Sequence, residues 1–128
     1  MIVVDASVLI GFLESDDAHH LHAVALLERT VDDDLAAHPL TIAEVLVVPA
    51  RTGQLELVSA VLRELGVAEC PFPANTARRL AELRATTRLK MPDCCVLLSA
   101  EGTGGAVATF DDALAAAARL LGLEVVGR

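Results

Sequence analysis

Residues 104–126 have the sequence GGAVATFDDALAAAARLLGLEVV, which contains a complete strand–helix–strand pattern. Two glycines lead into a short apolar strand at Ala106–Thr109, and an Ala- and Leu-rich helix follows at Asp111–Leu121. Gly122 ends this helix, and Glu124–Val126 is a second strand. Two strands separated by a helix require a crossover connection, which makes the strands parallel.

The same alternation extends from this segment back to the N-terminus. Further strands are predicted at Ile2–Asp5, Leu35–His38 and Val67–Cys70. Further helices are predicted at Ser7–Leu13, Ala18–Thr30, Thr41–Arg51, Leu55–Leu65, from Asn75 to about Arg88, and from Pro92–Asp93 to just before Gly102. We therefore expect one domain over residues 1–128, an α/β fold in which helices cover both faces of a mainly parallel sheet to give a three-layer α/β/α sandwich.

Single residues set the expected ends of three helices. Pro49 should bend or end the helix at Thr41–Arg51, because proline lacks the N–H that the helix needs. Gly66 suits the left-handed position that closes the helix at Leu55–Leu65. Asn75 is expected to cap the next helix with its side chain.

The composition of the chain limits the classes of protein to which it can belong. The chain has 128 residues, of which 54% are hydrophobic, so it can bury a core and is not disordered. Its 18 acidic and 10 basic residues give a formal net charge of -8, which excludes a basic protein that coats DNA. Only 2% of residues are aromatic, with neither Trp nor Tyr, so Ala, Leu and Val must fill the interior.

No membrane or export segment is predicted. Asp5 interrupts the first apolar run, no basic segment precedes it, and no window approaches the ~20 apolar residues of a spanning helix. The cysteines are odd in number: Cys94 and Cys95 are neighbours that do not readily bridge each other, and Cys70 stands alone. We expect buried thiols in the reducing cytoplasm, with neither a disulfide framework nor a zinc site.

Four carboxylates lie where a parallel sheet usually has its functional site, beyond the carboxyl ends of the strands. Asp5 and Asp111 end the first and fourth predicted strands. Asp93 opens a helix, and Glu44 lies in the helix after the second strand. We therefore expect these four side chains to meet at one edge of the sheet.

Each of these acids also has a simpler interpretation. Asp5 (or Ser7), Asp93 and Asp111 stand where helices begin, and Asp is a preferred N-cap residue. Taken singly, capping is the more common role at each position. Glu44 differs because its helical neighbours are almost all apolar, so it lies either at the rim of the core or beside a partner that holds it.

The chemistry of such a cluster follows from its charge. Carboxylates within a few ångströms repel one another, and a hard divalent cation such as Mg²⁺ or Mn²⁺ removes that conflict. The cation can activate a water and stabilise charge on a phosphoryl oxygen. Its positive charge also attracts a phosphate into a pocket that would otherwise repel it.

Four pieces of sequence, in order along essentially the whole chain, resemble PIN-domain ribonucleases, in particular the VapC toxins of bacterial toxin–antitoxin pairs. These pieces are Val4-Asp5-Ala6-Ser7-Val8-Leu9-Ile10, Glu44 after Thr41, Pro92-Asp93, and Thr109-Phe110-Asp111. The resemblance implies a five-stranded parallel sheet in the order 3-2-1-4-5. It also implies an Mg²⁺- or Mn²⁺-dependent endoribonuclease that hydrolyses phosphodiesters in RNA (tRNA, rRNA or mRNA) with a metal-activated water, leaving a 5′-phosphate and a 3′-hydroxyl.

The resemblance also assigns roles to individual residues. It implies that the catalytic and metal-binding residues are four acids: Asp5, Glu44, Asp93 and Asp111. Of these, Asp111 would support the metal or its waters. Ser7 and Thr109 match polar positions beside the pocket, where a hydroxyl orients a carboxylate or a water. Asp112 adds a second acid beside Asp111, so the choice between these two, and between one and two metal ions, stays open.

Basic residues concentrate in one segment, at Arg78, Arg79, Arg84, Arg88 and Lys90. They are either contacts to RNA phosphates or a solvated helix face with Glu82 as an ion-pair partner. Because aromatic residues are few, RNA recognition is expected to depend on shape and backbone.

His19, His20 and His22 are close in sequence but do not share one helix face. We therefore expect them at the surface and not in a metal site.

Val45–Val48 and Leu55–Leu65 are strongly apolar, which indicates either core packing or a partner surface. The resemblance implies a homodimer and a VapB-type antitoxin that wraps the toxin. The identities of the antitoxin, the RNA and the cleavage site stay open.

Three other functions are alternatives to the nuclease. A receiver-like signalling module needs an acidic pair at the first strand and a Lys after a late strand, whereas Asp5 has no adjacent acid and Lys90 precedes a helix. A phosphatase of the Asp-x-Asp type is disfavoured by Ser7. A PIN-like binding domain without activity is disfavoured by the presence of all four acids.

Overall fold

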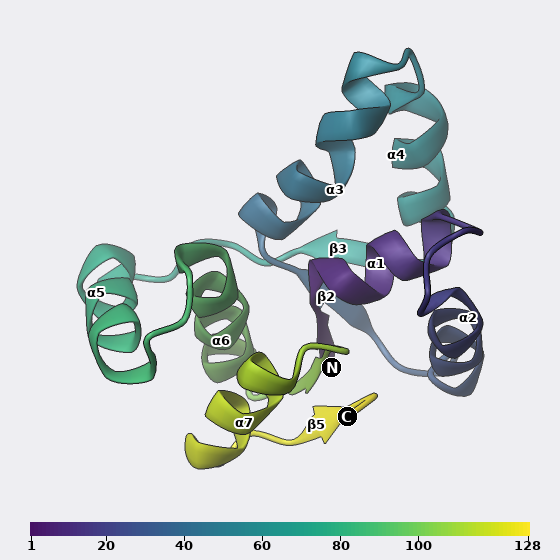
Figure 1. Cartoon of the computed structure of the whole chain (residues 1–128). Coiled ribbons are helices and arrows are strands. Elements are labelled where there is room, and N and C mark those ends of the chain that lie inside the picture. The colour runs from purple at the N-terminus through teal and green to yellow at the C-terminus, as the bar shows by residue number, and fades with distance from the viewer.

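The computed structural model describes residues 1–128 and contains one five-stranded sheet (Figure 1). Its strands are β1 (Ile2–Val4), β2 (Leu35–Ala37), β3 (Val67–Glu69), β4 (Ala106–Ala108) and β5 (Val125–Val126). They lie in the order β3-β2-β1-β4-β5, and every pair is parallel. The predicted order is therefore confirmed. A receiver-like module has the order 2-1-3-4-5, so that alternative is excluded.

Seven helices connect and cover these strands. They are α1 (Ala6–Leu13), α2 (His20–Arg29), α3 (Pro39–Arg51), α4 (Leu55–Glu64), α5 (Thr76–Thr87), α6 (Met91–Thr103) and α7 (Asp112–Leu120). In Figure 1, α3 and α4 form a hairpin that projects from the sheet beyond α1. None of the helices has the length and apolar character needed to cross a membrane.

Two separate cores, each of 14 buried residues, lie on the two faces of the sheet. Along β1, Ile2 and Val4 point into the core formed with α1, α2, α3 and α4, whereas Val3 points into the core formed with α5, α6 and α7. This alternation is the two-residue period of a strand buried on both sides. The three-layer arrangement expected from the sequence is confirmed.

Several helix boundaries differ from the prediction by one or two residues, and the start of α3 and the end of α6 have an identifiable cause. Helix α3 begins at Pro39, because the ring of His38 acts as its N-cap and accepts a hydrogen bond at Nδ1 from the Leu40 N–H at 3.1 Å. The helix continues past Pro49 and ends at Arg51. Helix α6 passes through Gly102 and ends only where Gly104 takes a left-handed conformation, with φ of 67°.

The predicted capping role of Asn75 is wrong. Asn75 occupies the position before α5, but its side chain makes no capping hydrogen bond. Its backbone is instead left-handed, with φ of 61°. Asn is one of the few residues other than Gly that tolerate this conformation, so it serves the turn that follows Pro73 and not the helix end.

The three cysteines are free and buried, as predicted. Burial raises the pKa of all three thiols, and that of Cys95 reaches about 11. These groups are therefore neutral packing residues at physiological pH, and they supply no thiolate ligand for a metal.

Candidate functional site

The candidate site lies at the carboxyl ends of β1 and β4, which are neighbours in the sheet. The strand order reverses between these two strands, because β1 is followed in the chain by β2 on its other side. Such a reversal opens a crevice at the strand ends. The helices that leave these strands, α1 and α7, begin at the same edge.

Asp5 is the central acid of this edge. It follows β1, and the residue is only 6% exposed. Its Oδ2 atom accepts hydrogen bonds from Ser7 Oγ and Thr109 Oγ1, both at 2.8 Å. Asp5 makes no capping bond to α1, so capping is the wrong interpretation at this position.

The two hydroxyls are themselves held by the backbone. Ser7 Oγ accepts from the Phe110 N–H at 3.1 Å, and Thr109 Oγ1 accepts from the Asp111 N–H at 2.9 Å. Each hydroxyl therefore uses a lone pair for the backbone and its proton for Asp5. The network fixes the orientation of the carboxylate and leaves Oδ1 without a hydrogen bond from the chain.

Asp93 lies in the first turn of α6, after Pro92, and is not the N-cap residue. Its pKa is raised to about 6, first by burial and then by the negative charges of three other acids: Asp5, Asp111 and Glu44. The positive charge of Lys90 opposes this shift. The coupling means that the four acids predicted from the sequence lie near one another.

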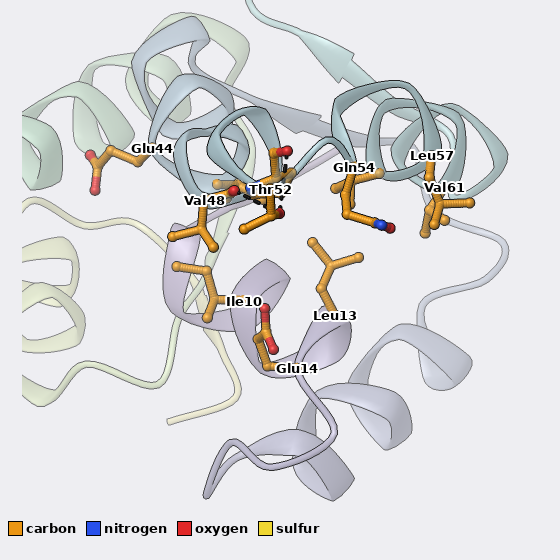
Figure 2. Close-up of a pocket in the computed structure, with 12 residues that line it drawn as sticks. Ile10, Leu13, Glu14, Glu44, Val48, Thr52, Gln54, Leu57 and Val61 are labelled. Carbon is orange, nitrogen blue, oxygen red and sulfur yellow. Dashed lines mark hydrogen bonds between the residues drawn. The ribbon is translucent and has the colours of Figure 1, made fainter.

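Glu44 lies at the rim of the site, on the solvent-exposed side of α3. Its pKa is raised by partial burial and by the charge of Asp5. In Figure 2 its carboxylate lies at one end of the helix pair and points away from Ile10 and Val48. Of the two interpretations left open by the sequence, the rim position is the correct one.

Asp111 combines two roles. Its Oδ1 accepts a hydrogen bond from the Leu114 N–H at 2.8 Å, so here the capping interpretation is correct. Its charge also raises the pKa of Asp93. Asp112, in contrast, is 87% exposed at its side chain and pairs with Arg128 Nε at 3.0 Å. Asp111 is therefore the member of this pair that faces the other acids.

The donor set fits a hard divalent cation. All the groups at this edge are carboxylate or hydroxyl oxygens, which Mg²⁺ and Mn²⁺ prefer. No three Asp, Glu, His or Cys side chains are close enough to enclose an ion by themselves. Mg²⁺ does not require such a cage, because it usually keeps several waters and uses one or two carboxylates directly. The pKa of Asp93 is raised first by burial and then by the charges of the neighbouring acids, and a cation at this edge would relieve that second, repulsive contribution.

The basic segment divides into paired and unpaired residues. Arg78 pairs with Glu82 at 3.2 Å, and Arg79 joins α5 to α6 by contacts to Glu82 at 3.0 Å and Glu101 at 2.6 Å. These two arginines thus match the solvated helix face. The other three basic residues, which form no ion pair, are Arg84, Arg88 and Lys90. Of these, Lys90 lowers the pKa of Asp93.

The histidines are more buried than the sequence suggested. His19 is half-buried and stacks on Phe110, with ring centroids 5.0 Å apart. His20 is also half-buried, and its Nδ1 lies 2.8 Å from the Gly11 carbonyl oxygen. Only His22 is exposed. His19 and His20 are thus partly covered at the surface by Phe110 and Gly11, neighbours that the sequence does not reveal.

An apolar groove of about 390 Å³ begins beside Glu44 (Figure 2). It lies between α1 and the α3–α4 hairpin, and Ile10, Val48 and Leu57 are among its lining residues. Val48 is 58% exposed and Leu57 is 62% exposed, whereas Val45 is buried in the core. The apolar segments thus serve both core and surface.

Comparisons with known proteins agree with this architecture. The structure is similar to FitAcB from Neisseria gonorrhoeae (22% identity, TM-score 0.73, 98% of this chain and 96% of that one). It is similar to FitAB bound to an IR36 DNA fragment (20%, 0.75, 98% and 94%). It is also similar to VapBC2 from Rickettsia felis bound to a DNA fragment from their promoter (14%, 0.70, 98% of each). No curated protein matches the sequence. The family described as PIN domain matches residues 2–120, and the chain therefore belongs to the PIN domain family.

Proposed function

We propose that the chain is a divalent-metal-dependent endoribonuclease and the toxin of a VapBC-type toxin–antitoxin pair. PIN domains are generally nucleases that depend on divalent metals. The observation that carries the proposal is the electrostatic coupling of Asp93 to Asp5, Glu44 and Asp111 at the switch point of the sheet. A site of four crowded carboxylates is costly to the fold without a cation.

In the proposed mechanism, the chain's own residues hold the metal and the reacting groups in place. Asp5 offers Oδ1, because Ser7 and Thr109 occupy Oδ2. Asp111 is anchored through Oδ1 to α7 and offers its second oxygen. When bound, Mg²⁺ or Mn²⁺ would lower the pKa of a water and neutralise charge on the phosphate. The activated water would supply the nucleophile for hydrolysis of the phosphodiester, and departure of the 3′-oxygen would leave a 5′-phosphate and a 3′-hydroxyl.

Incubation with total cellular RNA tests the activity. The purified protein should cleave RNA in Mn²⁺ or Mg²⁺ and lose cleavage in EDTA. Asp5→Asn should reduce the rate at least 100-fold while the circular dichroism spectrum stays unchanged. Asp32→Asn, an exposed acid in the turn before β2, is the matched control and should cleave normally. Cleavage that survives EDTA would refute the metal dependence. No cleavage of any RNA would refute the nuclease and favour an inactive PIN-like binding domain.

The antitoxin is proposed to occupy the apolar groove. The solved relatives are FitAB and VapBC2 complexes, and the groove exposes apolar side chains next to Glu44. Expression of the chain in a bacterial host should stop growth, and co-expression of a VapB-type antitoxin should restore it. Leu57→Asp should abolish this rescue, whereas Leu120→Asp, an 89% exposed Leu on α7, should not. Equal rescue of both variants would place the antitoxin elsewhere.

We also infer a homodimer, a single domain over residues 1–128 and a cytoplasmic location. Light scattering of the purified chain tests the dimer, because the measured molar mass should be twice that of the monomer. The location agrees with three free, buried cysteines.

A further inference from the structure

A second pocket, of about 220 Å³, lies beside the acidic site and has the opposite charge. Its lining includes His19, His22, Arg29, Phe110 and Arg128, and no acidic residue. The chain as a whole has a net charge of -8 with histidine counted as neutral, so a pocket lined by two arginines, two histidines and no acid is a local exception. We call it the histidine–arginine pocket.

The pocket and the acidic site share one stretch of backbone. The Phe110 N–H donates to Ser7 Oγ, which in turn donates to Asp5. The Phe110 carbonyl oxygen accepts from Arg128 Nε at 2.7 Å. Phe110 therefore separates the two regions, with the carboxylates on the N–H side and the arginine on the carbonyl side.

The basic groups of the pocket are held in place but have unused donors. His19 stacks on Phe110 at an interplanar angle of 20°, and the ring of His22 lies 6.5 Å from that of Phe110. Arg128 uses only Nε, for Phe110 and Asp112. Arg29 forms no ion pair, although the chain has an excess of acids. Guanidinium and imidazole N–H groups are suited to phosphate oxygens.

We propose that the histidine–arginine pocket binds a phosphate of the RNA strand, next to the nucleotide whose phosphodiester lies at the acidic site. This inference rests on the proposed nuclease function. The carboxylates repel the polyanionic strand wherever the metal does not neutralise them, so a cationic contact immediately beside them supplies attraction where the strand enters. The pocket thus positions the substrate and takes no part in bond cleavage.

The four histidines of the chain allow a direct test. The His ring signals of the protein in EDTA are followed by NMR while a single-stranded RNA hexamer is added. His19 and His22 should shift, because they line the pocket. His20, which contacts Gly11, and His38, which is buried at the start of α3, should stay in place. Adenosine 5′-monophosphate should move the same two signals more weakly.

Variants separate this site from the acidic site. Arg29→Ala should weaken binding of the RNA hexamer in EDTA about 10-fold. The salt dependence of that binding should fall by the equivalent of about one phosphate contact. The KM for RNA cleavage should rise, while kcat should not fall. Arg51→Ala, an exposed arginine at the end of α3 that is outside the pocket, is the matched control.

The results distinguish the two proposals. If RNA is cleaved but His19 and His22 do not shift and Arg29→Ala is normal, the pocket assignment is overturned while the nuclease stands. If RNA is not cleaved but shifts these two signals, the nuclease falls and the pocket stands. The assignment of the pocket as a phosphate site would be overturned if an acidic peptide shifts these signals and RNA does not. It would also be overturned if neither probe shifts them.

Discussion

At the scale of single residues, the site depends on two hydroxyl groups that fix the orientation of the Asp5 carboxylate. Ser7 and Thr109 both donate to Oδ2 of Asp5, and both accept a backbone N–H. The sequence allows the prediction that these polar residues lie beside the pocket. It does not allow the prediction of which oxygen they occupy, because that depends on a contact between residues at opposite ends of the chain.

Thr109→Val should weaken Mn²⁺ binding and RNA cleavage about 10-fold. The substitution keeps the shape of the buried side chain but removes the hydrogen bond to Asp5 and leaves the Asp111 N–H without its acceptor. It should also lower the free energy of unfolding by about 1–3 kcal/mol. Calorimetric titration with Mn²⁺ measures the first effect and urea unfolding the second. Thr103→Val, which loses only bonds to the Ser99 and Ala100 carbonyls, should keep full metal affinity. Unaltered affinity in Thr109→Val would contradict the role of this network.

Asp93→Asn should stabilise the protein in EDTA at pH 7.5 and at the same time abolish cleavage. Burial and the charges of Asp5, Asp111 and Glu44 raise the pKa of Asp93 to about 6, so its carboxylate is ionised at pH 7.5 at a cost to the fold. With allowance for solvent screening, removing that charge should gain about 1 kcal/mol. Urea unfolding in EDTA is the measurement. Asp112→Asn removes an acid that pairs with Arg128 and should give no gain; a destabilised Asp93→Asn would argue against crowding of the acids.

At the scale of secondary-structure elements, the sequence predicts the positions of the strands and helices better than it predicts their first and last residues. The β-α alternation follows from the apolar patterns, which is why all five strands and seven helices were found where expected. The errors fall where one residue acts against its usual preference. Gly102 continues α6, Asn75 bends the chain instead of capping, and the imidazole of His38 caps α3. Backbone angles account for the first two, because Gly104 and Asn75 are the left-handed residues, and a local hydrogen bond to the Leu40 N–H accounts for the third.

His38 should make the stability of the protein depend on pH. It is buried, its Nε2 has no hydrogen-bond partner, and burial lowers its pKa from the usual value of about 6.5. As pH falls below about 6.5, the unfolded chain binds a proton that the folded chain resists, so stability is lost with falling pH. His38→Asn keeps an N-cap acceptor for the Leu40 N–H but removes the titrating ring.

Urea unfolding at pH 7.5 and pH 5.5 tests this expectation. His38→Asn should lose less stability than the wild type over this interval. His20→Asn, which removes a half-buried histidine from another part of the molecule, should retain the wild-type dependence. An equal loss in all three proteins would show that His38 does not contribute.

At the scale of the whole molecule, the sheet order brings together groups that the sequence separates. Asp5 and Asp111 were predictable as neighbours because they follow strands, and the ends of parallel strands meet at one edge, whereas Asp93 and Glu44 belong to helices. The histidine–arginine pocket was not predictable, because His19, Phe110 and Arg128 belong to different elements with no shared motif. A site built on strand ends is thus visible in a sequence, whereas one built on packing between a loop, a helix start and the chain end is not.

Metal binding should therefore stabilise the whole fold through the acidic edge. Because the charges of Asp5, Glu44 and Asp111 act on Asp93 only in the folded protein, a cation held at this edge by one or two of these carboxylates binds the native state and not the unfolded chain. Mn²⁺ at 100 times its Kd should add about 2.7 kcal/mol, a rise in Tm of roughly 8 °C for a chain of this size. Thermal unfolding with Mn²⁺ and with EDTA measures it. Asp5→Asn should lose most of the rise while Asp32→Asn keeps it; a rise of the same size in Asp5→Asn would mean that the ion binds elsewhere, whatever the RNA assay shows.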